Sequence, residues 1–123
     1  MTANVAVVAL AAALFAVSGQ PAKGGLPLRH GRYVEIDAPC LGASSSSESW
    51  FGGGYAFQAP HVQCKAVQVA RLAPDRYRVV ERCFENADRA RPFAIVEHVR
   101  LLSHTEYELE NRFGAFRSRW CPG

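Results

Sequence analysis

The stretch VQCKAVQVARLAPDRYRVVERCF, residues 62 to 84, decides the fold. Its two halves, Val62 to Arg71 and Arg76 to Phe84, are rich in valine and alternate in polarity, which is typical of strands. Pro74 and Asp75 stand between them and indicate a turn, because proline presets one turn dihedral and aspartate bonds its own backbone. The stretch therefore predicts an antiparallel β-hairpin.

The chain has four cysteines, Cys40, Cys64, Cys83 and Cys121. They are too far apart in sequence to match the close pairs of a zinc site, so we expect no metal and favour disulfides over free thiols. Folding at the predicted turn brings Cys64 nearly opposite Cys83. By elimination Cys40 pairs with Cys121, which would join the first strand to the last.

The amino-terminal segment is apolar and uncharged. Residues 1 to 22 contain no Asp, Glu, Lys or Arg. The run from Val5 to Val17 is shorter than the roughly 20 residues that span a bilayer, and it fits the apolar region of a signal peptide. We predict a signal peptide over residues 1 to 18, a linker over 19 to 30 and a single β-barrel-like domain over 31 to 123. The alternatives are a buried hydrophobic helix or a misplaced start codon.

Further short strands flank the hairpin. In residues 32 to 38, Val34, Ile36 and Ala38 share one face and Tyr33, Glu35 and Asp37 share the other, which predicts a half-buried strand. Further strands are predicted at 93 to 101, near 105 to 110 and near 116 to 120, with residues 86 to 91 as a polar connection. These features predict an all-β fold, an antiparallel meander of six to eight strands closing into a barrel or sandwich.

Composition limits the partners and the location. The net charge of +3 is mild, and it does not indicate nucleic acid, which usually requires a concentrated basic stripe. No cysteine closely follows the apolar run, so we expect no stable membrane anchor after cleavage. The predicted disulfides and signal peptide favour export to a bacterial periplasm or the extracellular space. No cofactor is expected, and the oligomeric state stays open.

Two glutamates interrupt apolar strand faces. Glu81 shares a face with Tyr77, Val79 and Cys83, and Glu97 shares one with Ile95 and its apolar neighbours. Two inward carboxylates placed roughly opposite each other would repel, which raises the pKa of one of them unless a cation intervenes. One alternative is a bulge at Val79-Val80 that turns Glu81 outward. Another is an ion pair with an inward Arg117 or Arg119.

The segment WFGGGYAF, residues 50 to 57, is a second candidate site. Its three glycines allow many backbone conformations. Trp50, Phe51 and Tyr55 would form an exposed recognition surface if they lie at a barrel mouth. The alternative is a hairpin whose aromatic side chains point into the core.

The size, the predicted export and the strand pattern over residues 30 to 121 resemble those of small exported bacterial β-barrel inhibitors. These are the periplasmic lysozyme inhibitors and the metalloprotease inhibitors of the same compartment. The serine-rich stretch followed by glycines and Tyr55 is loosely similar to the Ser/Gly/Tyr inhibitory region of the lysozyme inhibitors. The resemblance implies inhibition of a secreted hydrolase, but it assigns a role to no residue of this chain.

We therefore expect an exported, non-catalytic binding module whose partner is a secreted or periplasmic protein. Inhibition of a secreted hydrolase is one form of that role. The sequence has no nucleophile elbow, phosphate loop or His-Glu-x-x-His motif, and the serines at 44 to 47 are typical of a solvated loop. One alternative is a small-molecule carrier or an enzyme that uses the barrel interior with Glu81 and Glu97. Another is a structural envelope protein.

Overall fold

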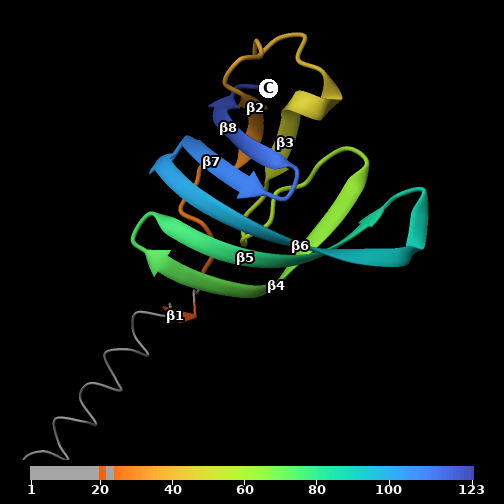
Figure 1. The fold of residues 1–123 in the computed structure, drawn as a ribbon. Coiled ribbons are helices and arrows are strands. Elements are labelled where there is room, and N and C mark those ends of the chain that lie inside the picture. The colour runs from red at the N-terminus through yellow and green to blue at the C-terminus, as the bar shows by residue number, and fades with distance from the viewer. Residues whose placement is uncertain (1–19, 22–23) are drawn as a thin grey trace, which may run out of the picture.

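The computed structural model describes residues 20–21 and 24–123 (Figure 1). The predicted signal peptide, residues 1 to 18, lies outside the described residues. The elements are β1 (Gln20–Pro21), β2 (Gly31–Glu35), a 3-10 turn η1 (Ser45–Ser47), β3 (Glu48–Phe51), β4 (Val62–Ala73), β5 (Arg76–Glu85), β6 (Asp88–Ser103), β7 (Glu106–Asn111) and β8 (Gly114–Cys121). No helix in this part of the chain is long and apolar enough to cross a lipid bilayer.

The strands form one antiparallel sheet in the order β1-β4-β5-β6-β7-β8-β2-β3. Strands β4 to β8 are sequential neighbours, which confirms the predicted meander. β1 adds only two residues beside β4, and the other seven strands curl into a half-barrel (Figure 1). The all-β prediction and the strand number are confirmed. Within the described residues the sheet ends at β1 and β3, so the expected closure into a barrel or sandwich is not seen.

Both predicted disulfides are present. Cys64 and Cys83 are directly paired residues of β4 and β5, and they form one bridge. Cys40 and Cys121 form the other, which ties the chain after β2 to the end of β8. Two intramolecular disulfides are more typical of exported proteins than of cytosolic ones.

Two predicted segments differ from the structure. The first strand ends at Glu35 rather than at residue 38, and the connection predicted at 86 to 91 is mostly strand, because β6 already begins at Asp88. The hairpin there is tight, with a turn at Asn86 and Ala87. Pro92 is tolerated inside β6 because it lies where the β5–β6 register is irregular.

The prediction that the first strand is buried on one face only was also wrong. Tyr33 and Val34, which lie on opposite faces, are both 0% exposed. Tyr33 belongs to the main core cluster. Val34 lies on the other face, where Arg119 bonds the carbonyl oxygens of Glu35 and Ala38 and holds the following loop against the sheet. Alternation fails in β2 because both of its faces are covered.

The main core lies on the concave side of the sheet and includes Tyr33, Phe51, Val79, Val99 and Tyr107. Leu26 and Leu28, from the segment predicted to be a linker, are also buried in it. A backbone hydrogen bond of 2.8 Å from Leu26 N to Gly54 O and one of 2.7 Å from Arg29 N to His104 O fix this segment. Residues 24–30 therefore contribute to the core although they form no strand.

Gly31 should tolerate substitution poorly. It has a φ of 137°, and a Cβ there would lie 2.6 Å from Nε1 of Trp120, which donates a hydrogen bond to His30 O. We expect Gly31→Ala to lower the free energy of unfolding by about 1–2 kcal/mol, measured by urea titration with tryptophan fluorescence. Gly52→Ala is the control, because nothing lies within 4 Å of a Cβ at Gly52. Equal stability of the two variants would contradict the prediction.

Candidate functional site

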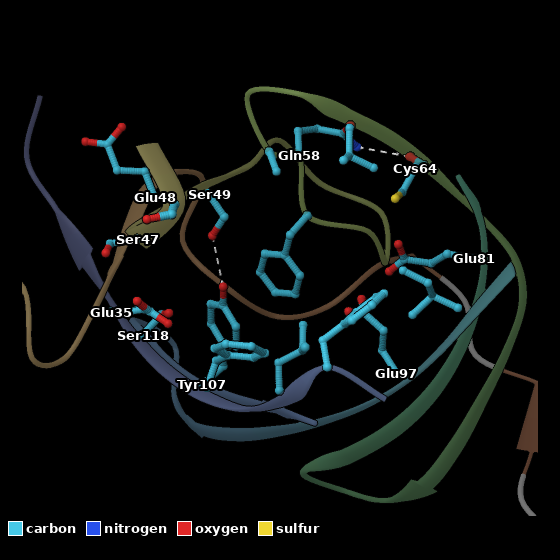
Figure 2. Close-up of a pocket in the computed structure, with 18 of the residues that line it drawn as sticks. Glu35, Ser47, Glu48, Ser49, Gln58, Cys64, Glu81, Glu97, Tyr107 and Ser118 are labelled. Atoms are coloured by element: carbon cyan, nitrogen blue, oxygen red, sulfur yellow. Dashed lines mark hydrogen bonds between the residues drawn. The ribbon is translucent and has the colours of Figure 1, made fainter. Parts of the chain in front are cut away.

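The concave face of the half-barrel encloses a cavity of about 370 Å³ (Figure 2). That volume lies within the range of small-molecule sites. The apolar part of its wall consists of Phe57, Val62, Phe93, Ile95, Leu109, Phe113 and Phe116. The polar part combines serines and Gln58 with five glutamates, Glu35, Glu48, Glu81, Glu85 and Glu97.

No lysine, arginine or histidine of the described residues lines this cavity. Among the described residues, Glu48 is the one lining glutamate whose carboxylate has a cation, because its Oε1 lies 2.8 Å from Nη1 of Arg32. Arg112 lies over the ring of Phe113, with its guanidinium 5.0 Å from the ring centre. The cavity is therefore strongly acidic in a protein whose net charge is positive.

The opposite, convex face of the sheet carries the basic residues. Lys65 of β4 is paired with Arg82 of β5, and Arg76 of β5 is paired with Arg100 of β6. All four are exposed. These cations therefore lie on the face of the sheet opposite the carboxyl groups of the cavity.

Glu81 and Glu97 both point into the cavity from neighbouring strands (Figure 2). Glu81 is only 2% exposed, and Glu97 is also buried. They are diagonal rather than opposite, because Glu81 is paired with Ile95 and Glu97 with Val79. Neither strand has a register shift at these pairs, so ordinary alternation along β5 and β6 carries both side chains inward.

The two carboxyl groups have different partners. Glu97 Oε2 accepts a 2.9 Å hydrogen bond from Nδ2 of Asn111. No donor of the described residues reaches Glu81 Oε1. Glu81 Oε2 lies 3.8 Å from Cys83 Sγ, which is part of a disulfide and has no proton to donate. The remaining polar neighbour of Glu81 is the carboxyl group of Glu97.

This environment raises the pKa of Glu81 from 4.5 to about 10. The largest cause is burial, followed by a hydrogen bond to the Glu97 carboxyl and by the charge of that group. A hydrogen bond between two carboxyl groups requires one of them to be protonated. Glu81 is therefore protonated and uncharged at neutral pH, which removes its charge repulsion with Glu97.

The alternatives considered for these glutamates are absent from the described residues. The bulge lies in β4, between Ala66 and Gln68, and not at Val79-Val80. Arg117 binds Glu106 on the outer face at 2.8 Å. The guanidinium of Arg119 is occupied by backbone carbonyl oxygens. Neither arginine neutralises the carboxyl pair.

Glu81 also lies near two sulfur atoms, those of Cys64 and Cys83. These sulfurs are joined to each other, so neither is a thiolate. The group offers a metal ion one carboxylate and no further anionic ligand, which does not fit the four ligands of a structural zinc site.

The residues predicted to form an aromatic recognition surface do not gather on one face. Trp50 is 40% exposed, whereas Phe51, the next residue of β3, is 1% exposed and packs in the core. Tyr55 is half-buried against Tyr77, with ring centroids 6.1 Å apart. Of the three residues expected to form this surface, only Trp50 is exposed.

Three aromatic residues that were not singled out from the sequence help to form the cavity. Phe57 stacks on Tyr107 with ring centroids 4.2 Å apart. Phe113 lies in the tight turn before Gly114 and Phe116 lies on β8, and both are exposed on the wall. Two aromatics flanking a turn glycine are the signal that could have drawn attention to them.

Tyr107 contributes a hydroxyl group to the polar part of the cavity wall. Its hydroxyl lies 3.0 Å from Oγ of Ser49, a contact that is visible in Figure 2. Burial raises the pKa of Tyr107 to about 12, so this hydroxyl stays neutral and pairs with Ser49. The unsatisfied polar group on the wall is therefore Glu81.

No family model matches the chain, and neither a curated protein nor a solved structure matches it.

Proposed function

We propose that this protein is a non-catalytic binding module that holds a small, partly apolar ligand in its concave cavity. The observation that carries the proposal is Glu81, a buried carboxyl group on the cavity wall that has an oxygen without a donor. An unsatisfied buried acceptor costs about 1–3 kcal/mol, and a ligand that donates to it recovers that stabilisation. Exposed Phe113 and Phe116 supply an apolar surface beside it.

The arrangement supports binding better than hydrolysis. Acid–base pairs that cleave glycosides hold their carboxyl groups about 5 Å or more apart, so that the substrate lies between them. Glu81 and Glu97 instead hydrogen-bond to each other. Because its raised pKa keeps Glu81 protonated at neutral pH, its carboxyl group is not available as a nucleophile or a general base.

We further propose that the protein acts outside the cytoplasm, in a periplasm or in the extracellular space. The two disulfides support this location, because such bonds persist in oxidising compartments. Inhibition of a secreted hydrolase receives less support than ligand binding, because only Trp50 of the aromatic segment offers a side chain to a partner protein.

The cavity can be tested with the neutral dye Nile red, whose emission reports an apolar environment. We expect saturable binding to the protein, and we expect Ala59→Trp to weaken it roughly fivefold because the indole would fill space at the wall. Ala59 is exposed, so this change should leave the fold intact. Ala87→Trp, in the exposed β5–β6 turn, is the matched control. Non-saturable uptake of the dye, or equal affinity of the Ala59→Trp and Ala87→Trp variants for it, would show that the dye does not bind in the cavity.

A further inference from the structure

We propose that the cavity selects a protonated amine with an apolar body, and that its ammonium group binds to the carboxyl groups of Glu81 and Glu97. This inference rests on the proposed function and names the ligand class of the same site. Three features of the cavity support it, namely the unpaired oxygen of Glu81, the absence of cations from the wall and the adjacent aromatic surface.

The carboxyl groups on the cavity wall lack hydrogen-bond donors. Among the described residues, no donor reaches Glu81 Oε1, and Glu97 accepts one hydrogen bond, from Asn111. The hydroxyl groups of Tyr107 and Ser49 satisfy each other. An ammonium group carries three donors and no acceptor, so it matches a pair of carboxylates that together lack several.

The charges around the pair also favour a cation. Glu35 and Glu85 line the same cavity, from β2 and from the end of β5, and no cationic side chain of the described residues lines it. Arg112 stacks on Phe93 and Phe113 at the edge of the wall, with its guanidinium 5.9 Å and 5.0 Å from the ring centres. The neighbours from β4 and β7 that face the pair, Cys64 in its disulfide and Asn111, are uncharged. Opposite charge close to a low-dielectric wall strengthens the attraction for a ligand cation.

The rest of the wall distinguishes an organic amine from a metal ion. Ca²⁺ requires six to eight oxygen ligands, and the groups beside the pair are a disulfide, a single asparagine and hydrocarbon. Phe57, Ile95 and Phe116 instead offer an apolar surface. An aromatic or aliphatic body of the ligand would cover this surface while its charged end reaches the carboxylates.

Proton balance follows from the two states of Glu81. Without ligand, the Glu81 carboxyl group is protonated at neutral pH, because its pKa is raised to about 10. When the ammonium group binds, Glu81 becomes a carboxylate, and its proton passes to solvent. The ammonium keeps its own three protons, so each binding event releases one proton at neutral pH.

The test compares 4-phenylbutylamine with 4-phenylbutanol, which has a similar body and no charge. We expect calorimetry at pH 7.5 to show binding of the amine about tenfold tighter or more. Titrations in phosphate and in Tris, which differ in ionisation enthalpy, should show release of about one proton per amine bound and none for the alcohol. The proton count needs no variant, so it is decisive even if a substitution impairs folding.

Glu81→Gln is expected to abolish both the preference for the amine and the proton release while still binding Nile red. Glu110→Gln is the matched control, because Glu110 is exposed and does not line the cavity. Equal affinities for amine and alcohol, or no proton release, would overturn the ligand class. Saturable Nile red binding in that case would leave the proposed function standing, whereas absence of all binding would defeat both.

Discussion

Glu81→Gln should make the ligand-free protein more stable, and the gain should grow with pH. Below pH about 4.5, Glu81 is protonated in the folded and unfolded states alike. Above that pH the unfolded chain loses the proton, while the folded state keeps it until its raised pKa of about 10. The folded state then binds one more proton than the unfolded state, so stability falls by up to about 1.4 kcal/mol per pH unit. Glutamine removes this dependence because it does not titrate.

The measurement is urea unfolding of both proteins at pH 5, 7 and 9. The difference between them isolates Glu81, since the other titrating groups are common to both. The free energy of unfolding of Glu110→Gln should change with pH as it does in the unsubstituted protein, because the side chain of Glu110 is exposed. A constant difference between Glu81→Gln and the unsubstituted protein across this range would show that Glu81 is ionised in the folded state.

Loss of the Cys40–Cys121 disulfide should destabilise the protein more than loss of Cys64–Cys83. The bridges close loops with sequence separations of 81 and 19 residues. In the chain-entropy model these loops correspond to about 4.5 and about 3 kcal/mol at 25 °C. The longer bridge also anchors the loop that covers Val34, which is fully buried.

The paired variants for this test are Cys40→Ala/Cys121→Ala and Cys64→Ala/Cys83→Ala. Alanine avoids giving Glu81 a new hydroxyl donor at position 83. Thermal unfolding at pH 6 should rank the unsubstituted protein first and the Cys40/Cys121 variant last. If the Cys64/Cys83 variant instead unfolds at the lowest temperature, the disulfide between β4 and β5 stabilises more of the fold than the hairpin that it closes.

Local signals predicted the centre of the fold well. The turn at Pro74-Asp75 and the placement of Cys64 and Cys83 around it determine the β4–β5 pairing, and the structure has that pairing. The faces of β5 and β6 also follow alternation, because each strand has one covered face. The inward orientation of Glu81 could therefore be anticipated from neighbouring residues.

Features that depend on distant segments could not be anticipated in this way. Leu26 and Leu28 lie among glycines and a proline, and their burial depends on contacts with Gly54 and His104. Strand β2 was predicted to be half-buried, but the loop that follows it covers its second face. The cavity itself requires Phe57 and Phe113, more than fifty positions apart, to converge on the curled sheet.

The position of β2 in the sheet determines when the protein can complete its fold. β2 pairs with β3 on one side and with β8 on the other, so that Arg32 faces Cys121 across the ladder. Polypeptides are synthesised from the amino terminus at about 5–20 residues per second, so β2 exists for several seconds before β8 does. During that interval Tyr33, Val34 and Phe51 have no completed sheet in which to be buried. The hairpin of β4 and β5 can form earlier, whereas β2 stays without its β8 partner until the last strand emerges.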